Sequence, residues 1–165
     1  MKLFLIGLPG SGKTTIGAAL ANRLSMEFVD LDKEIETREG NSVPEIFAAH
    51  GEAHFRQVES TLLLEWATAP RSFVMATGGG TPCFFDGIKV INEHGFSVFL
   101  DEQIDVIVAR LEHNEHRPLL KSANVVDMRT KLERLREARL SVYQKASITV
   151  SSPTVNKVLS SLPGM

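Results

Sequence analysis

The segment GLPGSGKT, residues 7–14, has the spacing of a loop that binds phosphate through its backbone. A continuous apolar run at residues 2–7 precedes it and a helical pattern at 13–25 follows it, as this motif requires. Lys13 is placed to reach the β- and γ-phosphates of a nucleotide, and the Thr14 hydroxyl to bind Mg²⁺. We therefore expect a nucleoside triphosphate to contact Gly10, Ser11, Gly12, Lys13, Thr14 and Thr15.

Asp30 and Asp32 stand one residue apart where the apolar run FVDL leaves a predicted strand at 27–30. Residues two apart in a strand point to the same side, so both carboxylates are expected to face one crevice. The next predicted strand ends in Thr77 and three glycines and offers no acid for a metal. Asp30 is thus the candidate for the metal shell, through a water molecule, and Asp32 for accepting a proton from the hydroxyl of a second substrate.

The segment TGGGTP, residues 77–82, is a second loop that exposes its backbone. It follows a predicted strand, and ligands of open α/β sheets bind at the carboxyl ends of the strands. The three consecutive glycines Gly78, Gly79 and Gly80 allow a small acceptor molecule to approach closely.

Three arginines are candidates for binding an anionic ligand. Arg139 occupies the apolar stripe of a predicted helix at 125–144, where an arginine must pair with a buried anion or extend to solvent. Arg56 lies at the edge of another stripe, with Glu59 placed to orient it, and Arg117 lies in a polar segment interrupted by Pro118. Guanidinium groups match carboxylates, so the acceptor is expected to carry one. Four further cations on the predicted helix are assigned to a solvated face: Arg129, Lys131, Arg134 and Arg136.

Short apolar runs alternate with helical patterns along the chain, which predicts βαβ units, a parallel sheet and an α/β fold. The runs cover residues 2–7, 27–30, 72–77, 96–100 and 147–150. Two stretches depart from the alternation. Residues 33–67 contain more than one helix, with a capping box at Ser42 and a helix stop at Gly51, and residues 112–124 are polar. We expect the first to hold a substrate and the second to be a mobile lid.

The composition limits the class of protein. A chain of 165 residues with 43% hydrophobic residues fits one domain, here residues 1–165. A formal net charge of −2 argues against a general nucleic-acid binder. The first apolar run is too short for a membrane span, and the single cysteine, Cys83, excludes an intrachain disulfide framework. A cytoplasmic protein that interacts with neither membrane nor nucleic acid is the expectation.

The sequence resembles the shikimate kinase family over nearly its whole length. The resemblance is carried by GLPGSGKT, DLD, GEAHFR, GGG and RPLL, and by RLSVY where the family has R-x-P-x-Y. It implies transfer of the ATP γ-phosphate to the 3-hydroxyl of shikimate, on the route to aromatic amino acids, with ATP as co-substrate and one Mg²⁺ per subunit. It also implies a three-layer P-loop kinase fold like that of nucleoside monophosphate kinases, with a five-stranded parallel sheet, an insertion at 33–61, a lid at 112–124 and a monomeric chain.

By position, the resemblance places catalytic roles on Lys13, Asp32 and Arg117, the last of which also contacts the nucleotide. Arg110 and Pro153 would flank the adenine. The shikimate-binding residues would be Asp32, Arg56, Phe47, Phe55, Gly78, Gly79, Gly80 and Arg139. The sequence departs from the family at Ser141, where the motif has proline, and in residues 151–157, which lack the basic residue expected beside the adenine.

Two alternatives remain open. A gluconate kinase would share the phosphate loop and the small size, but the pair GEAHFR and GGG is not expected in it. A nucleotide-binding regulator without catalysis would lose one of the reactive residues, whereas Lys13, Thr14, Asp30, Asp32 and Arg117 are all present.

Overall fold

The computed structural model describes residues 1–113 and 125–164 of the chain. Its centre is a five-stranded parallel sheet in the order β2-β3-β1-β4-β5. The strands are β1 (Lys2–Ile6), β2 (Glu27–Asp30), β3 (Phe73–Ala76), β4 (Phe96–Asp101) and β5 (Ile148–Ser151). The α/β class, the parallel sheet and all five predicted strands are confirmed, and no strand end differs from its predicted position by more than one residue.

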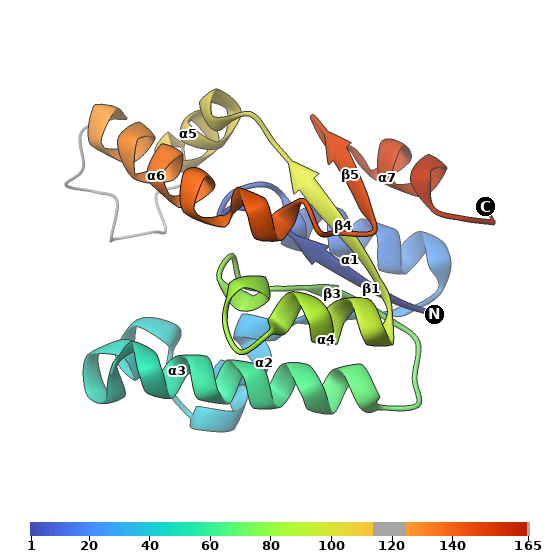
Figure 1. Cartoon of the computed structure of the whole chain (residues 1–165), viewed down its shortest axis with the longest axis horizontal. Helices are drawn as coiled ribbons and strands as arrows, with labels where there is room; N and C mark the ends of the chain where they lie inside the picture. The colour runs from blue at the N-terminus through green and yellow to red at the C-terminus, as the bar shows by residue number, and fades with distance from the viewer. Residues whose placement is uncertain (114–124, 165) are drawn as a thin grey trace.

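Helices cover both faces of the sheet (Figure 1). They are α1 (Lys13–Leu24), α2 (Leu31–Glu39), α3 (Val43–Thr68), α4 (Gly87–His94), α5 (Ile104–Glu112), α6 (Val125–Tyr143) and α7 (Val155–Ser161), with a 3₁₀ turn η1 (Thr81–Cys83). In β1, Leu3 and Leu5 pack toward α1 and α7, while Phe4 and Ile6 pack toward the core that α3, α4 and α6 complete. Strands covered on both faces have continuous apolar runs, which is the pattern of the sequence.

The segment between β2 and β3 contains the two helices α2 and α3, as expected. Ser42 and Glu45 form the predicted capping box at the start of α3, because each side chain accepts from the other residue's backbone N–H. Gly51 lies inside α3 with φ 80° and ψ 174°, so the chain kinks where the sequence predicts a stop and the helix then resumes.

The carboxyl ends of the strands carry both glycine loops. The loop at residues 7–12 joins β1 to α1, and the loop at residues 77–80 joins β3, the neighbour of β1, to η1. Their predicted ligand-binding segments therefore lie side by side at one edge of the sheet. Within the described residues no helix is long and apolar enough to cross a membrane.

Candidate functional site

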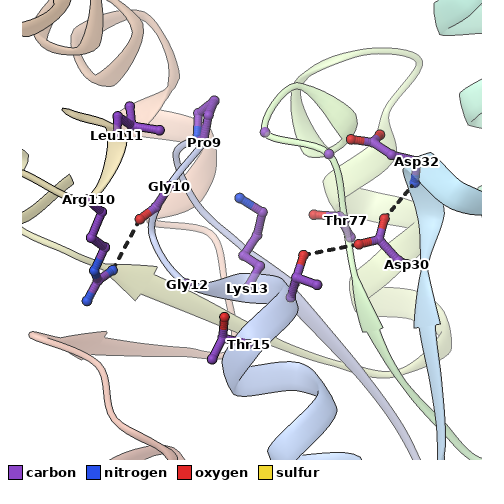
Figure 2. Close-up of a pocket in the computed structure, with 13 residues that line it drawn as sticks. Pro9, Gly10, Gly12, Lys13, Thr15, Asp30, Asp32, Thr77, Arg110 and Leu111 are labelled. Carbon is purple, nitrogen blue, oxygen red and sulfur yellow. Dashed lines mark hydrogen bonds between the residues drawn. The ribbon is translucent and has the colours of Figure 1, made fainter. Parts of the chain in front are cut away.

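A cavity of about 300 Å³ opens between the two glycine loops (Figure 2). Its wall comes from the phosphate loop, the start of α1, the junction of β2 and α2, the second glycine loop and α5. The lining residues are Pro9, Gly10, Gly12, Lys13, Thr14, Thr15, Asp30, Asp32, Thr77, Gly78, Gly79, Arg110 and Leu111. The cavity thus brings together most of the residues predicted to bind nucleotide and metal.

The phosphate loop adopts a conformation that requires glycine. Gly10 and Gly12 have φ values of 80° and 95°, in the left-handed region. Gly12 is the N-cap of α1, so the first turn of that helix faces the cavity with its backbone N–H groups and their partial positive charge. The Ser11 hydroxyl is buried and, among the described residues, is the only buried side-chain polar atom without a hydrogen-bond partner.

Lys13 is held inside the site by the loop itself. Its ammonium group donates to the carbonyl oxygens of Gly7 and Leu8, at 2.9 and 2.8 Å, and the side chain is buried. Figure 2 shows the amine pointing into the cavity between the two loops. The position suits a cation that contacts the phosphates of a nucleotide.

Thr14 and Asp30 meet on one side of the cavity. The Thr14 hydroxyl donates to Asp30 Oδ2 at 3.0 Å, and the backbone N–H of Asp32 donates to Asp30 Oδ1 (Figure 2). The backbone N–H of Lys33 donates to the same oxygen. Asp30 is therefore the N-cap of α2. A hydroxyl and a carboxylate oxygen in contact form an oxygen donor set that suits Mg²⁺.

The prediction that Asp32 continues the strand that ends at Asp30 is wrong. Asp32 lies in the first turn of α2 and not in an extension of β2. The chain turns into the helix at Asp30, because the Asp30 carboxylate caps the helix that starts at Leu31. Both carboxylates nevertheless line the same cavity.

Asp32 is an unusually weak acid for an aspartate. Burial, and then the negative charges of Asp30 and Glu59, raise its pKa from 3.8 to about 6, against the opposing charge of Lys13. At neutral pH the group is still ionised, and it is more basic than an ordinary carboxylate. Such a group is suited to accept a proton from a hydroxyl.

The glycine triplet at 78–80 is where the predicted charged residues converge. A Cβ at Gly78 would lie 3.2 Å from Asp32 Oδ1, and one at Gly79 would lie 3.1 Å from Arg139 Nη1. A Cβ at Gly80 would lie 2.5 to 2.7 Å from three atoms of the Arg56 guanidinium. The missing side chains therefore leave room for charged groups from other elements: Asp32 of α2 and Glu59 of α3 at Gly78, Arg139 of α6 at Gly79, and Arg56 of α3 at Gly80.

Arg56 is fixed by a buried carboxylate, as the sequence predicts. Its Nη1 donates to Glu59 Oε2 at 2.8 Å, and Glu59 is only 2% exposed. Glu59 Oε1 accepts in turn from the Thr81 hydroxyl at 2.6 Å, so the same carboxylate ties α3 to η1. The sequence gives no sign of this second bond, which depends on packing between distant elements.

Tyr143 is a site residue that the apolar stripe of the helix does not identify. Its hydroxyl donates to the carbonyl oxygen of Gly79 at 2.6 Å, and its ring is fully buried beside Phe99. Burial raises the pKa of Tyr143 to about 12, against the nearby Arg139 charge. The signal available in the sequence was the segment RLSVY, in which Tyr143 follows Arg139 by four residues on the same helix.

The remaining predicted residues lie around this centre. Arg110 Nη1 donates to Gly10 O at 3.1 Å and Nη2 pairs with Glu102 at 2.8 Å. Phe47 and Phe55 are in contact, with ring centroids 4.6 Å apart, but they do not line the cavity. Pro153 is buried in the loop between β5 and α7 and does not line it either. Arg117 and most of the predicted lid at 112–124 fall outside the described residues.

One expectation about charged residues is corrected, and one stays a prediction. Lys157 Nζ donates to the carbonyl oxygens of Ser151 and Ser152 within its own segment, and the expected lack of a basic residue beside the adenine stays a prediction. Arg136 does not lie on a freely solvated face, since it pairs with Asp101 at 3.0 Å and its side chain is 31% exposed.

Comparison with known proteins places the chain in a family. The family model described as shikimate kinase matches residues 9–161. The shikimate kinase of Parabacteroides distasonis is 40% identical over 90% of this chain and 86% of its own length. A gluconokinase from Sinorhizobium meliloti, at 17% identity and a TM-score of 0.59, shares the fold alone.

Two solved structures are more similar than the gluconokinase. The crystal structure of shikimate kinase from Bacteroides thetaiotaomicron has a TM-score of 0.88 and 37% identity, covering 92% of this chain and 86% of its own. That from Acinetobacter baumannii, solved in complex with shikimate, has a TM-score of 0.85 and 32% identity over 96% of this chain and 90% of its own. With its P-loop kinase fold and the family model matched over most of its length, the chain belongs to the shikimate kinase family.

Proposed function

We propose that this protein transfers the γ-phosphate of ATP to the 3-hydroxyl of shikimate, giving shikimate 3-phosphate for aromatic amino acid biosynthesis. The observation that supports this most directly is the convergence of Asp32, Arg56 and Arg139 on the glycine triplet, beside the phosphate loop. One carboxylate and two guanidinium groups, on three different elements, match an acceptor that carries a hydroxyl and a carboxylate.

Shikimate is bound in this proposal with its carboxylate between Arg56 and Arg139 and its 3-hydroxyl at Asp32. Gly78, Gly79 and Gly80 let the ring approach the backbone, and Phe47 and Phe55 support the pocket from α3. Asp32 accepts the hydroxyl proton as the phosphorus–oxygen bond forms. A pKa of about 6 leaves Asp32 ionised at neutral pH and supports this role.

ATP occupies the phosphate loop in this proposal, with its phosphates on the backbone of residues 10–15 and on Lys13. Arg110 and Pro153 flank the adenine, and Arg117 acts on the transferred phosphate from the lid at 112–124. Thr14 and Asp30 would hold one Mg²⁺, whose charge would offset that of the phosphates. The Thr14–Asp30 contact supports this assignment.

We further infer the organisation of the working protein. Residues 1–165 form one domain, in which 33–61 is the substrate-binding insertion, and the protein acts as a cytoplasmic monomer. The single cysteine is compatible with a reducing compartment.

The test is ADP release by the purified protein with Mg·ATP and shikimate, gluconate or no acceptor. ADP release that depends on shikimate alone supports the proposal. ADP release with gluconate would show that gluconate is the acceptor and that the proposed substrate is wrong. No ADP release with any acceptor, together with measurable ATP binding, would favour a non-catalytic regulator.

A further inference from the structure

Phe84 is a large apolar residue at the surface, and its ring packs on the guanidinium of Arg56. The Arg56 Cζ atom lies 4.3 Å from the centroid of the Phe84 ring and 5.2 Å from that of Phe55. Both distances are within the range of cation–π attraction, which is about 6 Å. Phe84 remains 38% exposed, so burial of its own ring does not explain the position.

The backbone after Phe84 is held in a conformation that its residues disfavour. Phe85 and Asp86 have φ values of 48° and 55°, although neither is glycine. The Gly87 N–H donates to the Phe84 carbonyl oxygen at 2.9 Å, which closes a turn with two consecutive left-handed residues. A bulky residue such as Phe85 is rare in this region, and such strain concentrates at functional sites.

The same segment is packed tightly against its own beginning. A Cβ at Gly87 would overlap the carbonyl oxygen of Thr81, and the Cys83 N–H donates to Gly80 O at 2.8 Å. The Thr81 hydroxyl is bonded to Glu59, the residue that also fixes Arg56. Glu59 and Thr81 therefore position both the strained turn at residues 84–87 and the guanidinium of Arg56.

The hydrogen bonds of Arg56 leave one edge open for a ligand. Nη1 pairs with Glu59 and Nε with Glu52, at 2.8 and 3.4 Å. Within the part of the chain that the structure describes, Nη2 donates to no protein group, while the aromatic rings of Phe55 and Phe84 restrict water around the cation. An ion pair at that edge is strengthened by the lower local dielectric.

We propose that Phe84 is a positioning residue for recognition of the substrate carboxylate: it acts through Arg56, whose guanidinium it orients and shields from water. This inference rests on the proposed function, since the carboxylate is that of shikimate. Phe84 does not take part in phosphoryl transfer, so its loss affects acceptor binding and not the chemical step.

The test compares Phe84→Leu with the control Phe85→Leu. Leucine keeps the apolar bulk of Phe84 and removes the aromatic face, and Phe85 is the more exposed neighbour at 62%. We expect Phe84→Leu to raise the KM for shikimate about fivefold to tenfold, with kcat and the KM for ATP unchanged. Phe85→Leu is expected to leave all three values within about twofold.

Two further measurements separate recognition through Arg56 from a general structural effect. With methyl shikimate, which lacks the negative charge, Phe84→Leu and the wild type should have equal kcat/KM. In an Arg56→Lys background, the Phe84→Leu effect on kcat/KM should shrink to less than about twofold. An unchanged KM for shikimate in Phe84→Leu, or an equal loss of kcat/KM with methyl shikimate, overturns the inference. The proposed function is tested separately, by turnover of shikimate by the wild-type protein, and does not depend on this result.

Discussion

Replacing Asp32 with asparagine is expected to stabilise the fold at neutral pH and to remove most turnover. Asp32 is ionised there although its surroundings disfavour the charge, because burial and the charges of Asp30 and Glu59 raise its pKa from 3.8 to about 6. The unfolded chain has no such surroundings. Ionisation of Asp32 therefore lowers the free energy of unfolding, whereas an uncharged asparagine of similar size does not.

The pH dependence follows from the direction of this shift. The raised pKa means that the folded state binds more protons than the unfolded state between about pH 4 and pH 6, so stability falls as pH rises through this window. One pKa unit corresponds to about 1.4 kcal/mol, which makes the full cost about 3 kcal/mol above pH 6. The asparagine variant also lacks the favourable negative charge in the first turn of α2, worth about 0.5 kcal/mol, which leaves a net gain of about 2.5 kcal/mol.

The assay is urea unfolding of the wild type and Asp32→Asn at pH 4 and pH 8, with ADP release measured at pH 8. We expect the variant to be about 2.5 kcal/mol more stable at pH 8, with most of that difference absent at pH 4. Glu34→Gln is the control, because Glu34 lies in the same helical turn, and it should change stability by less than about 0.5 kcal/mol. Normal turnover in Asp32→Asn, or a stability difference that is the same at both pH values, would refute the reasoning.

Three further outcomes are expected. In the wild type, kcat/KM for shikimate should fall about tenfold per pH unit below about pH 6, because Asp32 must be ionised to accept a proton; a flat profile from pH 5 to pH 8 would contradict this. Gly80→Ala should raise the KM for shikimate at least about tenfold, because a Cβ there would lie 2.5 Å from Arg56 Nη2. The backbone φ of −90° suits alanine, so backbone strain would not explain the change. An unchanged KM would argue against carboxylate binding by Arg56. Tyr143→Phe should cost about 0.5 to 1.5 kcal/mol in urea unfolding and weaken shikimate binding, because the partly buried carbonyl of Gly79 loses the hydrogen bond from the Tyr143 hydroxyl, and wild-type stability would show that water replaces that hydroxyl.

Local features were predictable from the sequence, because neighbouring residues determine them. The glycines of the phosphate loop, the capping box at Ser42 and the five apolar strands all depend on residues a few positions apart. Asp32 shows the limit of that reasoning. Alternation in a strand places it in the correct cavity, but the N-cap at Asp30 starts a helix at Leu31, two residues before the predicted helical segment at 33–67.

Contacts between distant segments were not predictable in the same way. Tyr143 and Gly79 are 64 residues apart in sequence, and no local pattern connects them. The position of Phe84 over Arg56 depends on a turn whose two left-handed residues, Phe85 and Asp86, do not favour that conformation. Arg136 has the pattern of a solvated residue on its own helix, and only the packing of α6 against the end of β4 brings it to Asp101.

The most direct test of the account is a crystal structure of the protein with shikimate and Mg·ADP bound. We expect the shikimate carboxylate to lie within hydrogen-bond distance of Arg56 and Arg139. The 3-hydroxyl should lie within hydrogen-bond distance of Asp32 and face the phosphates of the nucleotide. A carboxylate bound elsewhere, or a 3-hydroxyl turned away from Asp32, would contradict the proposed arrangement of the site.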